Sequence, residues 1–415
     1  MVRTDRKQNI EERAGNVNFP IKSTFLKWLI PSESKLTLAE HLKVRKWVIS
    51  KKDTKYIFNL LELDRGVDKV LYNPNIRLYV SYIDRFKKKN PAKEVELIDM
   101  FIKTYGNYDV ARMVEVGMNS PRTKTFSKRM RLELLNNWLA NERTAHDIFS
   151  LLKIDTAGYS LFKAPKMNKE SNPTLNIFAR YIDQLNMLPR SRKVKLIDLF
   201  SEKYDDKAIA KMVEIGVMVP STNAVSSKLL RELLSKWNRH KKSADDVLKV
   251  LNLDKAGDEL FASPGLITLF LYTKKTTELD NPTNDLLQVL TKHYGYDGLS
   301  KIFVMGQHRT DLAVLAKDLE TTMGSQWLKS KLSPDEVFKL LKLNDDVDTL
   351  LTNPIFLKTW ESYRILFNLK NGGKTSTMET LTTFYTKTEL SSMLKAAKEV
   401  PATKNLAIKL LNELN

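Results

Sequence analysis

Histidines and cysteines are the first residues to consider for catalytic or metal-binding chemistry. The five histidines are scattered, and the closest two, His293 and His308, are 15 residues apart. The His-Glu-x-x-His spacing that places two zinc ligands on one helix face is therefore missing. The chain has no cysteine, which excludes disulfides, a cysteine nucleophile and every cysteine-based metal centre. The sequence predicts no metal and no cofactor.

One glycine-rich segment, Gly372-Gly373-Lys374-Thr375, resembles the end of a phosphate-binding loop. A complete P-loop requires another glycine five residues before the last one, with a strand ahead of the loop. Asn368 occupies that position, and the preceding residues have the pattern of a helix. We predict a connection between two helices at this segment and no nucleotide site.

Paired carboxylates at Asp205-Asp206, Asp245-Asp246 and Asp345-Asp346 could in principle act as acid and base. Each pair is predicted to lie at the start of a helix, where negative charge interacts favourably with the helix dipole. No Gly-x-Ser-x-Gly nucleophile motif and no dinucleotide-binding fingerprint is present. These observations predict that the protein is not an enzyme.

Two basic clusters are the remaining candidates for a functional surface, and we predict that they lie in equivalent loops. They consist of Lys87, Lys88 and Lys89, and of Arg190, Arg192, Lys193 and Lys195. The net charge is +19 over 415 residues, and residues 1–236 carry +17 of it. The clusters could bind an acidic partner or a phosphate backbone, or they could be solvated surface charge. No aromatic residue flanks the second cluster, which disfavours binding of single-stranded nucleic acid.

The elements that position these clusters follow from a fourfold internal repeat. Four tryptophans are separated by 91, 99 and 90 residues, and a helix-capping residue follows each of them six positions later. A tyrosine follows farther on, and we interpret the eight aromatic residues as the core of each repeat. They form the pairs Trp47 and Tyr82, Trp138 and Tyr181, Trp237 and Tyr272, and Trp327 and Tyr363.

Apolar positions within each repeat recur at the spacing of an amphipathic helix. Segments such as Ile76–Tyr82 and Leu266–Tyr272 could be strands when taken alone, but their counterpart Thr174–Tyr181 is plainly compatible with a helix, so we predict helices for all three. A repeat of about 93 residues accommodates four or five helices of average length. The predicted fold is all-α, a tandem array of four small helical bundles.

This pattern resembles the WY/LWY modules of oomycete RXLR effectors, which are secreted proteins of plant pathogens such as Phytophthora. The Trp and Tyr pairs correspond to the modules' signature residues, and Leu97-Ile-Asp-Met-Phe101 is similar to their Leu motif. Upstream, Asn9-Ile-Glu-Glu-Arg13 resembles the EER motif, which assigns Glu11, Glu12 and Arg13 to a translocation-like motif. The Arg-x-Leu-Arg tetrapeptide and a signal peptide are not found. Either the chain begins after processing or it departs from the standard pattern.

The resemblance implies that the bundles are chained end to end in an elongated, curved rod. We expect an N-terminal leader with the EER-like motif and a first helix, followed by one WY-type and three LWY-type repeats. These expected parts are residues 1–36 for the leader, 37–127 for repeat 1, 128–226 for repeat 2, 227–316 for repeat 3 and 317–415 for repeat 4.

The resemblance also implies a function inside the host plant cell, in the cytoplasm or the nucleus. Our first hypothesis is a monomeric, non-enzymatic adaptor that binds a host protein and suppresses immunity, with the scaffold and catalytic core of protein phosphatase 2A as the candidate partner. The alternative is a suppressor of RNA silencing that binds nucleic acid through the basic N-terminal half. No apolar run is long enough to predict a membrane helix.

Overall fold

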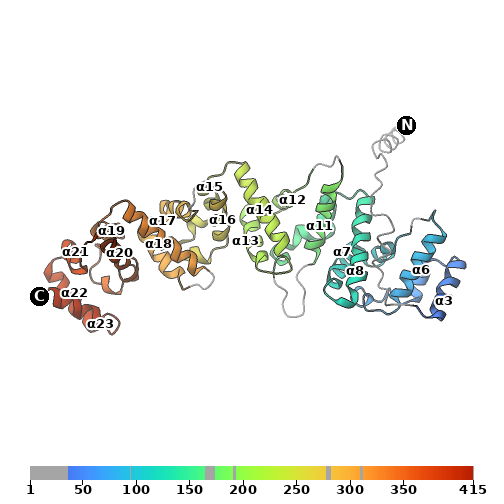
Figure 1. Cartoon of the computed structure of the whole chain (residues 1–415), viewed down its shortest axis with the longest axis horizontal. Helices are drawn as coiled ribbons and strands as arrows, with labels where there is room; N and C mark the ends of the chain where they lie inside the picture. The colour runs from blue at the N-terminus through green and yellow to red at the C-terminus, as the bar shows by residue number, and fades with distance from the viewer. Residues whose placement is uncertain are drawn as a thin grey trace. The chain divides into compact units, whose positions relative to one another are not determined.

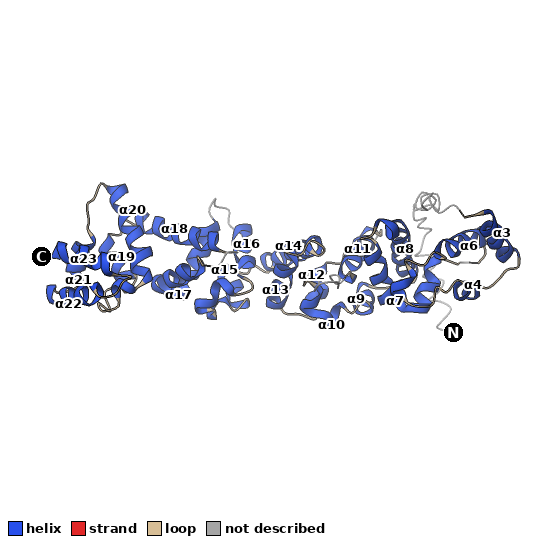
Figure 2. Ribbon diagram, turned by 90° about the horizontal axis from the view of Figure 1, so that it is seen from below, coloured by secondary structure: helices blue, strands red, loops and turns tan. Residues whose placement is uncertain are grey.

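The computed structural model of the chain describes residues 36–93, 95–163, 173–189, 193–276, 282–308 and 312–414. Every regular element in these ranges is a helix, which confirms the predicted all-α class (Figure 2). Two compact units are present: unit 1 comprises Met1–Lys203 and Val219–Val225, and unit 2 comprises Tyr204–Met218 and Ser226–Asn415. Each unit contains two of the four Trp–Tyr pairs.

The helices follow one another along the chain with short connections (Figure 1). Those of unit 1 are α3 (Leu38–Ile49), α4 (Thr54–Leu60), α5 (Val67–Val70), α6 (Ile76–Lys89), α7 (Leu97–Gly117), α8 (Pro121–Ala140), α9 (Ala145–Leu151), α10 (Ile154–Ala157), η2 (Gly158–Leu161), α11 (Thr174–Met187) and α12 (Leu196–Ser201). The predicted helices at Ile76 and Thr174 are therefore confirmed.

The remaining helices belong to unit 2, apart from the first three residues of α14. They are α13 (Asp206–Val217), α14 (Asn223–Arg239), α15 (Ala244–Val250), η3 (Leu253–Lys255), η4 (Gly257–Ala262), α16 (Leu266–Thr276), α17 (Pro282–Gly306), α18 (Ala313–Lys329), α19 (Pro334–Leu340), η5 (Leu350–Thr352), the π-helix η6 (Ile355–Trp360), α20 (Glu361–Asn371), α21 (Thr377–Phe384), α22 (Lys387–Lys398) and α23 (Lys404–Leu414). Leu266 thus begins a helix, as predicted.

A tryptophan and a tyrosine meet edge to face in the core of every repeat. The ring centroids of Trp327 and Tyr363 are 5.4 Å apart at an interplanar angle of 84°, and the other three pairs have the same geometry at up to 6.4 Å. This is a favoured arrangement of aromatic rings. All eight side chains are buried, and Trp47, with 7% of its surface exposed, is the least enclosed. The four bundles are therefore built around the same aromatic contact.

The turn after each Trp-bearing helix fixes the position of the tyrosine. In this turn the backbone N–H five residues after the tryptophan donates to the tryptophan carbonyl, as Lys242 does to Trp237 at 3.1 Å. The residue before that donor has a positive φ, which together with the hydrogen bond defines a Schellman motif. The freed carbonyl at the turn then accepts the tyrosine hydroxyl, as from Tyr272 to Lys242 at 2.6 Å. The equivalent hydroxyls of Tyr82, Tyr181 and Tyr363 donate to Lys52, Arg143 and Leu332.

Burial keeps these hydroxyls protonated, so they remain donors over the whole accessible pH range. Removal from water raises the pKa of Tyr82, Tyr181 and Tyr363 to about 12 because the phenolate would lose its hydration. The next residue after each turn is the helix cap expected from the sequence. Thr144, Ser243 and Ser333 form complete capping boxes with a carboxylate three residues later, and Asp53 accepts two backbone N–H groups.

Glycines interrupt two of the long helices immediately after the second tyrosine of a repeat. Gly106 in α7 and Gly295 in α17 have φ of 78° and 67° with extended ψ, a conformation that side chains rarely adopt. Repeats 2 and 4 have a different residue at this position: Asp205 and Thr386 are N-caps that begin α13 and α22 as new helices. The same bend is thus made in two ways.

Small residues allow the two helices at the end of a repeat to cross closely. Gly117 of α7 lies against Ser127 of α8, and Gly306 of α17 lies against Ala316 of α18. Alanine at position 306 would place its Cβ 2.8 Å from the ring of Phe261 and 3.2 Å from the Ala316 Cβ. These atoms are held in a packed core, so little relaxation is available.

Gly306→Ala is expected to destabilise unit 2 by about 1–3 kcal/mol, the usual cost of overpacking. Gly324→Ala is the matched control, because Gly324 is also helical but a methyl group added there would meet only atoms at 4.0 Å. That control should be neutral or stabilising by up to about 1 kcal/mol, since alanine favours a helix over glycine. Urea unfolding followed by circular dichroism would compare them, and equal midpoints would contradict the close crossing.

Candidate partner-binding surface

The first basic cluster does not lie in a loop, as the sequence had predicted, but forms the last turn of a helix. Lys87, Lys88 and Lys89 end α6, and Asn90 caps it. The physical reason is the helix dipole, because positive side chains are favourable near the C-terminal carbonyls. The helix therefore continues through the cluster instead of ending before it.

The second basic cluster is only partly described. Lys193 and Lys195 lie in the segment between α11 and α12, whereas Arg190 and Arg192 lie outside the described residues. The translocation-like motif Glu11, Glu12 and Arg13 also lies outside them. The described lysines of the two clusters thus belong to a helix end in one case and to a connection in the other.

The lysines of these clusters differ in their availability to a partner. The Lys87 ammonium group pairs with Glu96, and that of Lys193 donates to the backbone carbonyl of Asn186. Lys88, Lys89 and Lys195 are exposed, and within the described part of the chain they form no ion pair. These three cations offer positive charge that the described residues do not neutralise.

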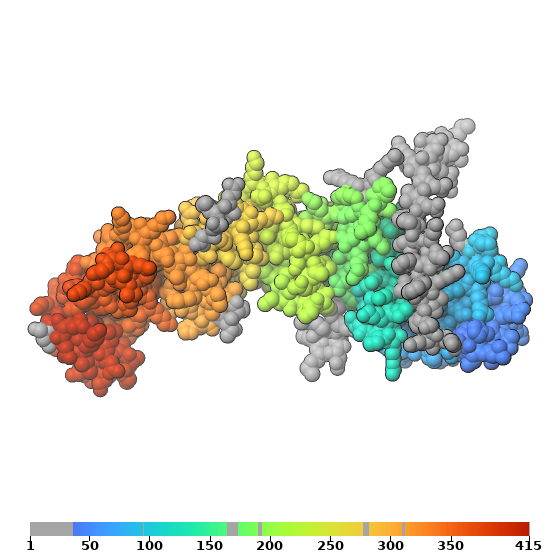
Figure 3. Space-filling model, viewed as in Figure 1, coloured from blue at the N-terminus to red at the C-terminus, as the bar shows by residue number. Residues whose placement is uncertain are grey.

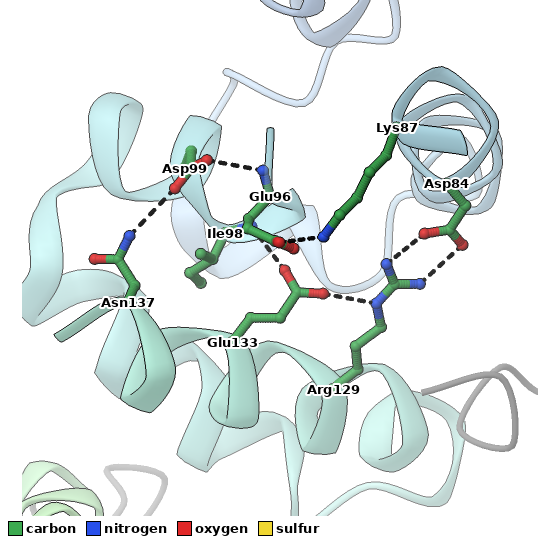
Figure 4. A network of polar contacts seen from close by, with 8 residues as sticks. All are labelled: Asp84, Lys87, Glu96, Ile98, Asp99, Arg129, Glu133 and Asn137. Carbon is green, nitrogen blue, oxygen red and sulfur yellow. Dashed lines mark hydrogen bonds and ion pairs between the residues drawn. The ribbon is translucent and has the colours of Figure 1, made fainter. Parts of the chain in front are cut away.

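A buried network of ion pairs lies beneath the first cluster and joins α6, α7 and α8 (Figure 4). The guanidinium group of Arg129 holds both carboxylate oxygens of Asp84, at 3.0 and 2.6 Å, and its Nε lies 2.9 Å from Glu133. The second oxygen of Glu133 accepts the backbone N–H of Ile98 at 3.1 Å. Arg129 therefore links the Tyr-bearing helix of repeat 1 to the Trp-bearing helix of repeat 2.

Burial and charge act against each other in this network. Only 7% of Arg129 and 6% of Glu133 is exposed. Burial raises the pKa of the Glu133 carboxyl, and the neighbouring Arg129 partly offsets that rise. Burial lowers the pKa of Arg129, but its hydrogen bonds and ion pairs with Asp84 and Glu133 outweigh this and raise it. The arginine stays charged, and its charge is what keeps two carboxylates in the interior.

The Asp84–Arg129–Glu133 network was not anticipated from the sequence. A signal for it exists, because similar residues recur at the same distances from the next signature aromatics. Asp183 follows Tyr181 by two residues as Asp84 follows Tyr82, and Lys228 and Glu232 precede Trp237 by nine and five residues as Arg129 and Glu133 precede Trp138. Alignment on the tryptophans would have shown these charges at positions that are otherwise expected to be apolar.

Unit 2 has a different buried carboxylate at its own junction between repeats. Glu320 of α18 is 8% exposed and accepts hydrogen bonds from Gln307 of α17 at 2.8 Å and from Thr359 of η6 at 3.0 Å. Lys317 supplies the neutralising charge at 3.0 Å. A single acidic side chain thus joins three helices, although it lies two residues away from the position that Glu133 occupies in repeat 2.

The segments that could have carried catalytic chemistry have structural roles in the described residues. Gly372 ends α20 in the left-handed conformation, at φ 63°, so the glycine-rich segment is a connection between helices, as predicted. Asp205 caps α13, and Asp245 and Asp246 lie in the first turn of α15. The prediction was wrong for Asp346, which instead accepts hydrogen bonds from Asp348 and Thr349 in a turn ahead of η5.

Two other kinds of site have no candidate in the described ranges. No three acidic or histidine side chains there are grouped so that they could bind a metal ion. No described helix combines the length and the apolar character needed to span a bilayer.

Comparison with known proteins places these features in a family. An RxLR effector protein of Phytophthora infestans is 41% identical over 286 residues, which cover 68% of this chain and 74% of the relative. The chain belongs to the RxLR effector proteins. The WY-domain model of effector PexRD54 matches residues 323–363, which begin shortly before Trp327 and end at Tyr363.

Two further RxLR effectors cover more of the chain. PSR2 of Phytophthora sojae is 29% identical over 92% of this chain, which spans about half of that relative, 56%. The crystal structure of PcRxLR12 aligns over 92% of this chain and 86% of its own with a TM-score of 0.66 and 24% identity, a likeness that shows the fold alone. The predicted resemblance to WY-type RXLR effectors is confirmed, and the chain is a pathogen effector of this family.

Proposed function

We propose that this RxLR effector is a non-enzymatic adaptor that binds a host protein and thereby suppresses immunity. The observation that carries the proposal is the use of the repeated aromatic residues: the four Trp–Tyr pairs are all buried in the cores of the bundles. The exposed helix faces remain free to differ between repeats and to contact a partner. A scaffold of repeats that leaves its outer faces variable is the usual design of an extended protein-binding surface.

The candidate partner is the scaffold and catalytic core of host protein phosphatase 2A, which the effector would occupy in place of a regulatory subunit. We place the contact on the basic side chains of repeats 1 and 2, because Lys88, Lys89 and Lys195 are exposed and unpaired in the described structure. Positive charge there favours an acidic partner surface through complementarity and faster association. The protein would act as a monomer after secretion, in the cytoplasm or nucleus of the host cell.

A pull-down from plant leaf extract with the purified chain, read by mass spectrometry, tests the proposal directly. Recovery of the phosphatase scaffold and catalytic subunits without their own regulatory subunit would support it. Recovery of a different host protein would keep the adaptor but replace the partner. A chain that recovers no host protein at all would count against the adaptor function.

Reversing the charge of the clusters is expected to weaken partner capture at least about tenfold, an effect of about 1.4 kcal/mol. The variant combines Lys88→Glu and Lys89→Glu with Arg190→Glu, Arg192→Glu, Lys193→Glu and Lys195→Glu. A matched control is Lys395→Glu with Lys398→Glu, because these lysines are also exposed and also lie in the last turn of a helix, α22. Capture by the cluster variant that equals capture by the control would eliminate this surface.

The charge distribution supports a second candidate function, binding of RNA by the N-terminal half. Residues 1–236 carry a net charge of +17, whereas the rest carry +2. Contacts to phosphates release counterions, so such binding would weaken steeply as salt increases. A gel-shift titration at low ionic strength decides the matter, since a chain that shifts no RNA there does not act by sequestering it.

A further inference from the structure

Helix α3, the first described helix, carries an apolar stripe on its exposed side. Leu38 is 77% exposed, Leu42 58% and Ile49 56%. At 100° per residue these three side chains fall within an arc of about 40° on the helix. Figure 3 shows the α3 region, in blue, at the surface of unit 1. Scattered apolar residues are common on protein surfaces, but three in one line on a 12-residue helix form an uncovered face.

The repeat explains what this face is. Leu38 and Leu42 precede Trp47 by nine and five residues, the same distances at which Arg129 and Glu133 precede Trp138. On α8 these positions are buried, because Asp84 of α6 and the start of α7 lie over them. On α3, whose neighbour α6 lies toward α8 in both views (Figures 1 and 2), no described residue covers them.

The side chains at these positions indicate what kind of surface would cover them. Arg129 and Glu133 match an ion pair with Asp84 on the repeat before them. Leucines at the equivalent positions of α3 could not match a carboxylate, since burying an unpaired charge against them is unfavourable. The segment that covers α3 must therefore be apolar, and it must replace the preceding repeat that α8 has.

The residues that precede α3 contain one segment of this character. Between Pro20 and Pro31 the chain reads Ile-Lys-Ser-Thr-Phe-Leu-Lys-Trp-Leu-Ile, with Ile21, Phe25 and Trp28 at the spacing of a single helix face. Residues 31–37 can span at most about 25 Å when extended, and α3 is about 18 Å long. The segment can therefore reverse direction and lie along α3.

We propose that residues 21–30 pack on Leu38, Leu42 and Ile49 and close the first repeat of unit 1. The apolar face of the segment replaces the ion network that joins repeats 1 and 2. Arrays of repeats need such a cap, because a terminal repeat otherwise exposes the surface on which its neighbour would pack. The inference does not depend on the proposed partner or on the basic clusters.

Hydrogen exchange of the full chain, read by mass spectrometry, tests the cap. We expect backbone amides of residues 21–30 to exchange about tenfold or more slower than in an unstructured peptide. The double variant Leu38→Glu with Leu42→Glu should abolish that protection while α6 stays protected. Met187→Glu is the control, since Met187 is a helix residue 80% exposed in another part of unit 1. Unprotected residues 21–30 in the wild-type chain, or protection that survives the double variant, would overturn the proposal.

A second variant and a mass measurement separate the cap from other coverings of α3. Phe25→Ser with Trp28→Ser changes only the proposed cap and should speed exchange in α3. Unchanged exchange in α3 would overturn the proposal. A wild-type dimer in light scattering that Leu38→Glu with Leu42→Glu makes monomeric would assign the stripe to a second copy, and would also overturn it.

Discussion

Replacing Arg129 by methionine is expected to cost unit 1 about 3–5 kcal/mol at neutral pH, because it leaves buried carboxylates without their counter-charge. Glu133 is 6% exposed and has no other positive partner in the network, and Asp84 loses both of its hydrogen bonds to the guanidinium group. Methionine keeps most of the side-chain volume, so the effect reports charge more than packing. Urea unfolding followed by circular dichroism gives the free energy, and hydrogen exchange of α6, α7 and α8 locates it.

Two controls distinguish a buried network from an ordinary ion pair. Arg112→Met breaks an exposed pair with Asp68, in which the two side chains are 37% and 75% exposed, and should cost no more than about 1 kcal/mol. Arg129→Met combined with Glu133→Leu and Asp84→Leu should recover much of the loss, because apolar residues often replace a buried ion pair at little cost. If Arg129→Met costs no more than Arg112→Met, the network does not stabilise the junction.

The same variant should show a characteristic dependence on pH. Burial already raises the pKa of Glu133 in the native chain, and loss of Arg129 removes the charge that lowers it. A carboxyl whose folded pKa is raised stabilises the fold when it is protonated, below its unfolded pKa of about 4.3. The deficit of Arg129→Met should thus be smallest at about pH 4 and should grow as the pH rises through the folded pKa of Glu133. An equal deficit at both ends of that range would show that Glu133 is not the cause.

The parts of the fold that follow from local rules could be predicted from the sequence. A Ser or Thr followed by an acid three residues later forms a capping box whatever the rest of the chain does, and Ser333 with Glu336 behaves as expected. The fourfold Trp and Tyr pattern could also be recognised, because the same core is needed in each repeat. These signals depend on residue type and spacing alone.

The turns after the Trp-bearing helices had no such signal. Lys51, Glu142, Lys241 and Lys331 all have φ between 47° and 57°, where glycine is the expected residue. The cost of a left-handed side chain is of order 1 kcal/mol, and the Schellman hydrogen bonds together with the accepted tyrosine hydroxyl offset it. Because the tyrosine lies about 30 or more positions farther along the chain, the local sequence at the turn does not predict this compensation.

The candidate surface was predicted in composition but not in form. The lysines at 87–89 were recognised, yet they were assigned to a loop because a run of charge resembles one, whereas the dipole of α6 favours them at its end. The ion network beneath them depends on Asp84 meeting Arg129, 45 residues away. Only the packing of α8 across α6 and α7 brings these charges together, so tertiary structure was required to find it.

Trp138→Ala is expected to destabilise unit 1 by about 3–5 kcal/mol, as for other large-to-small changes in a core. The indole ring is 1% exposed, packs edge to face on Tyr181 at 5.5 Å, and donates its N–H to Asn107 at 2.8 Å. Truncation would leave a cavity between two repeats and an unpaired amide on Asn107. Unfolding in urea measures the loss, and hydrogen exchange should place it mainly in unit 1, since repeat arrays transmit such effects chiefly to nearest neighbours. A variant that unfolds at the wild-type midpoint would show that Trp138 is not part of the core.

Phenylalanine at the same positions separates the indole hydrogen bond from the packing of the ring. Trp138→Phe removes the bond to Asn107 and should cost more than Trp327→Phe, because the N–H of Trp327 is buried without a partner in the described structure. A lost hydrogen bond that leaves a buried acceptor unsatisfied is worth about 1–3 kcal/mol, whereas removal of an unpaired N–H relieves a desolvation penalty. Both rings face their tyrosine edge to face at nearly the same distance, 5.5 and 5.4 Å, so the packing contributions are closely matched. Equal losses in the two variants would mean that the repeats are held by aromatic packing alone, and that Asn107 does not fix the orientation of Trp138.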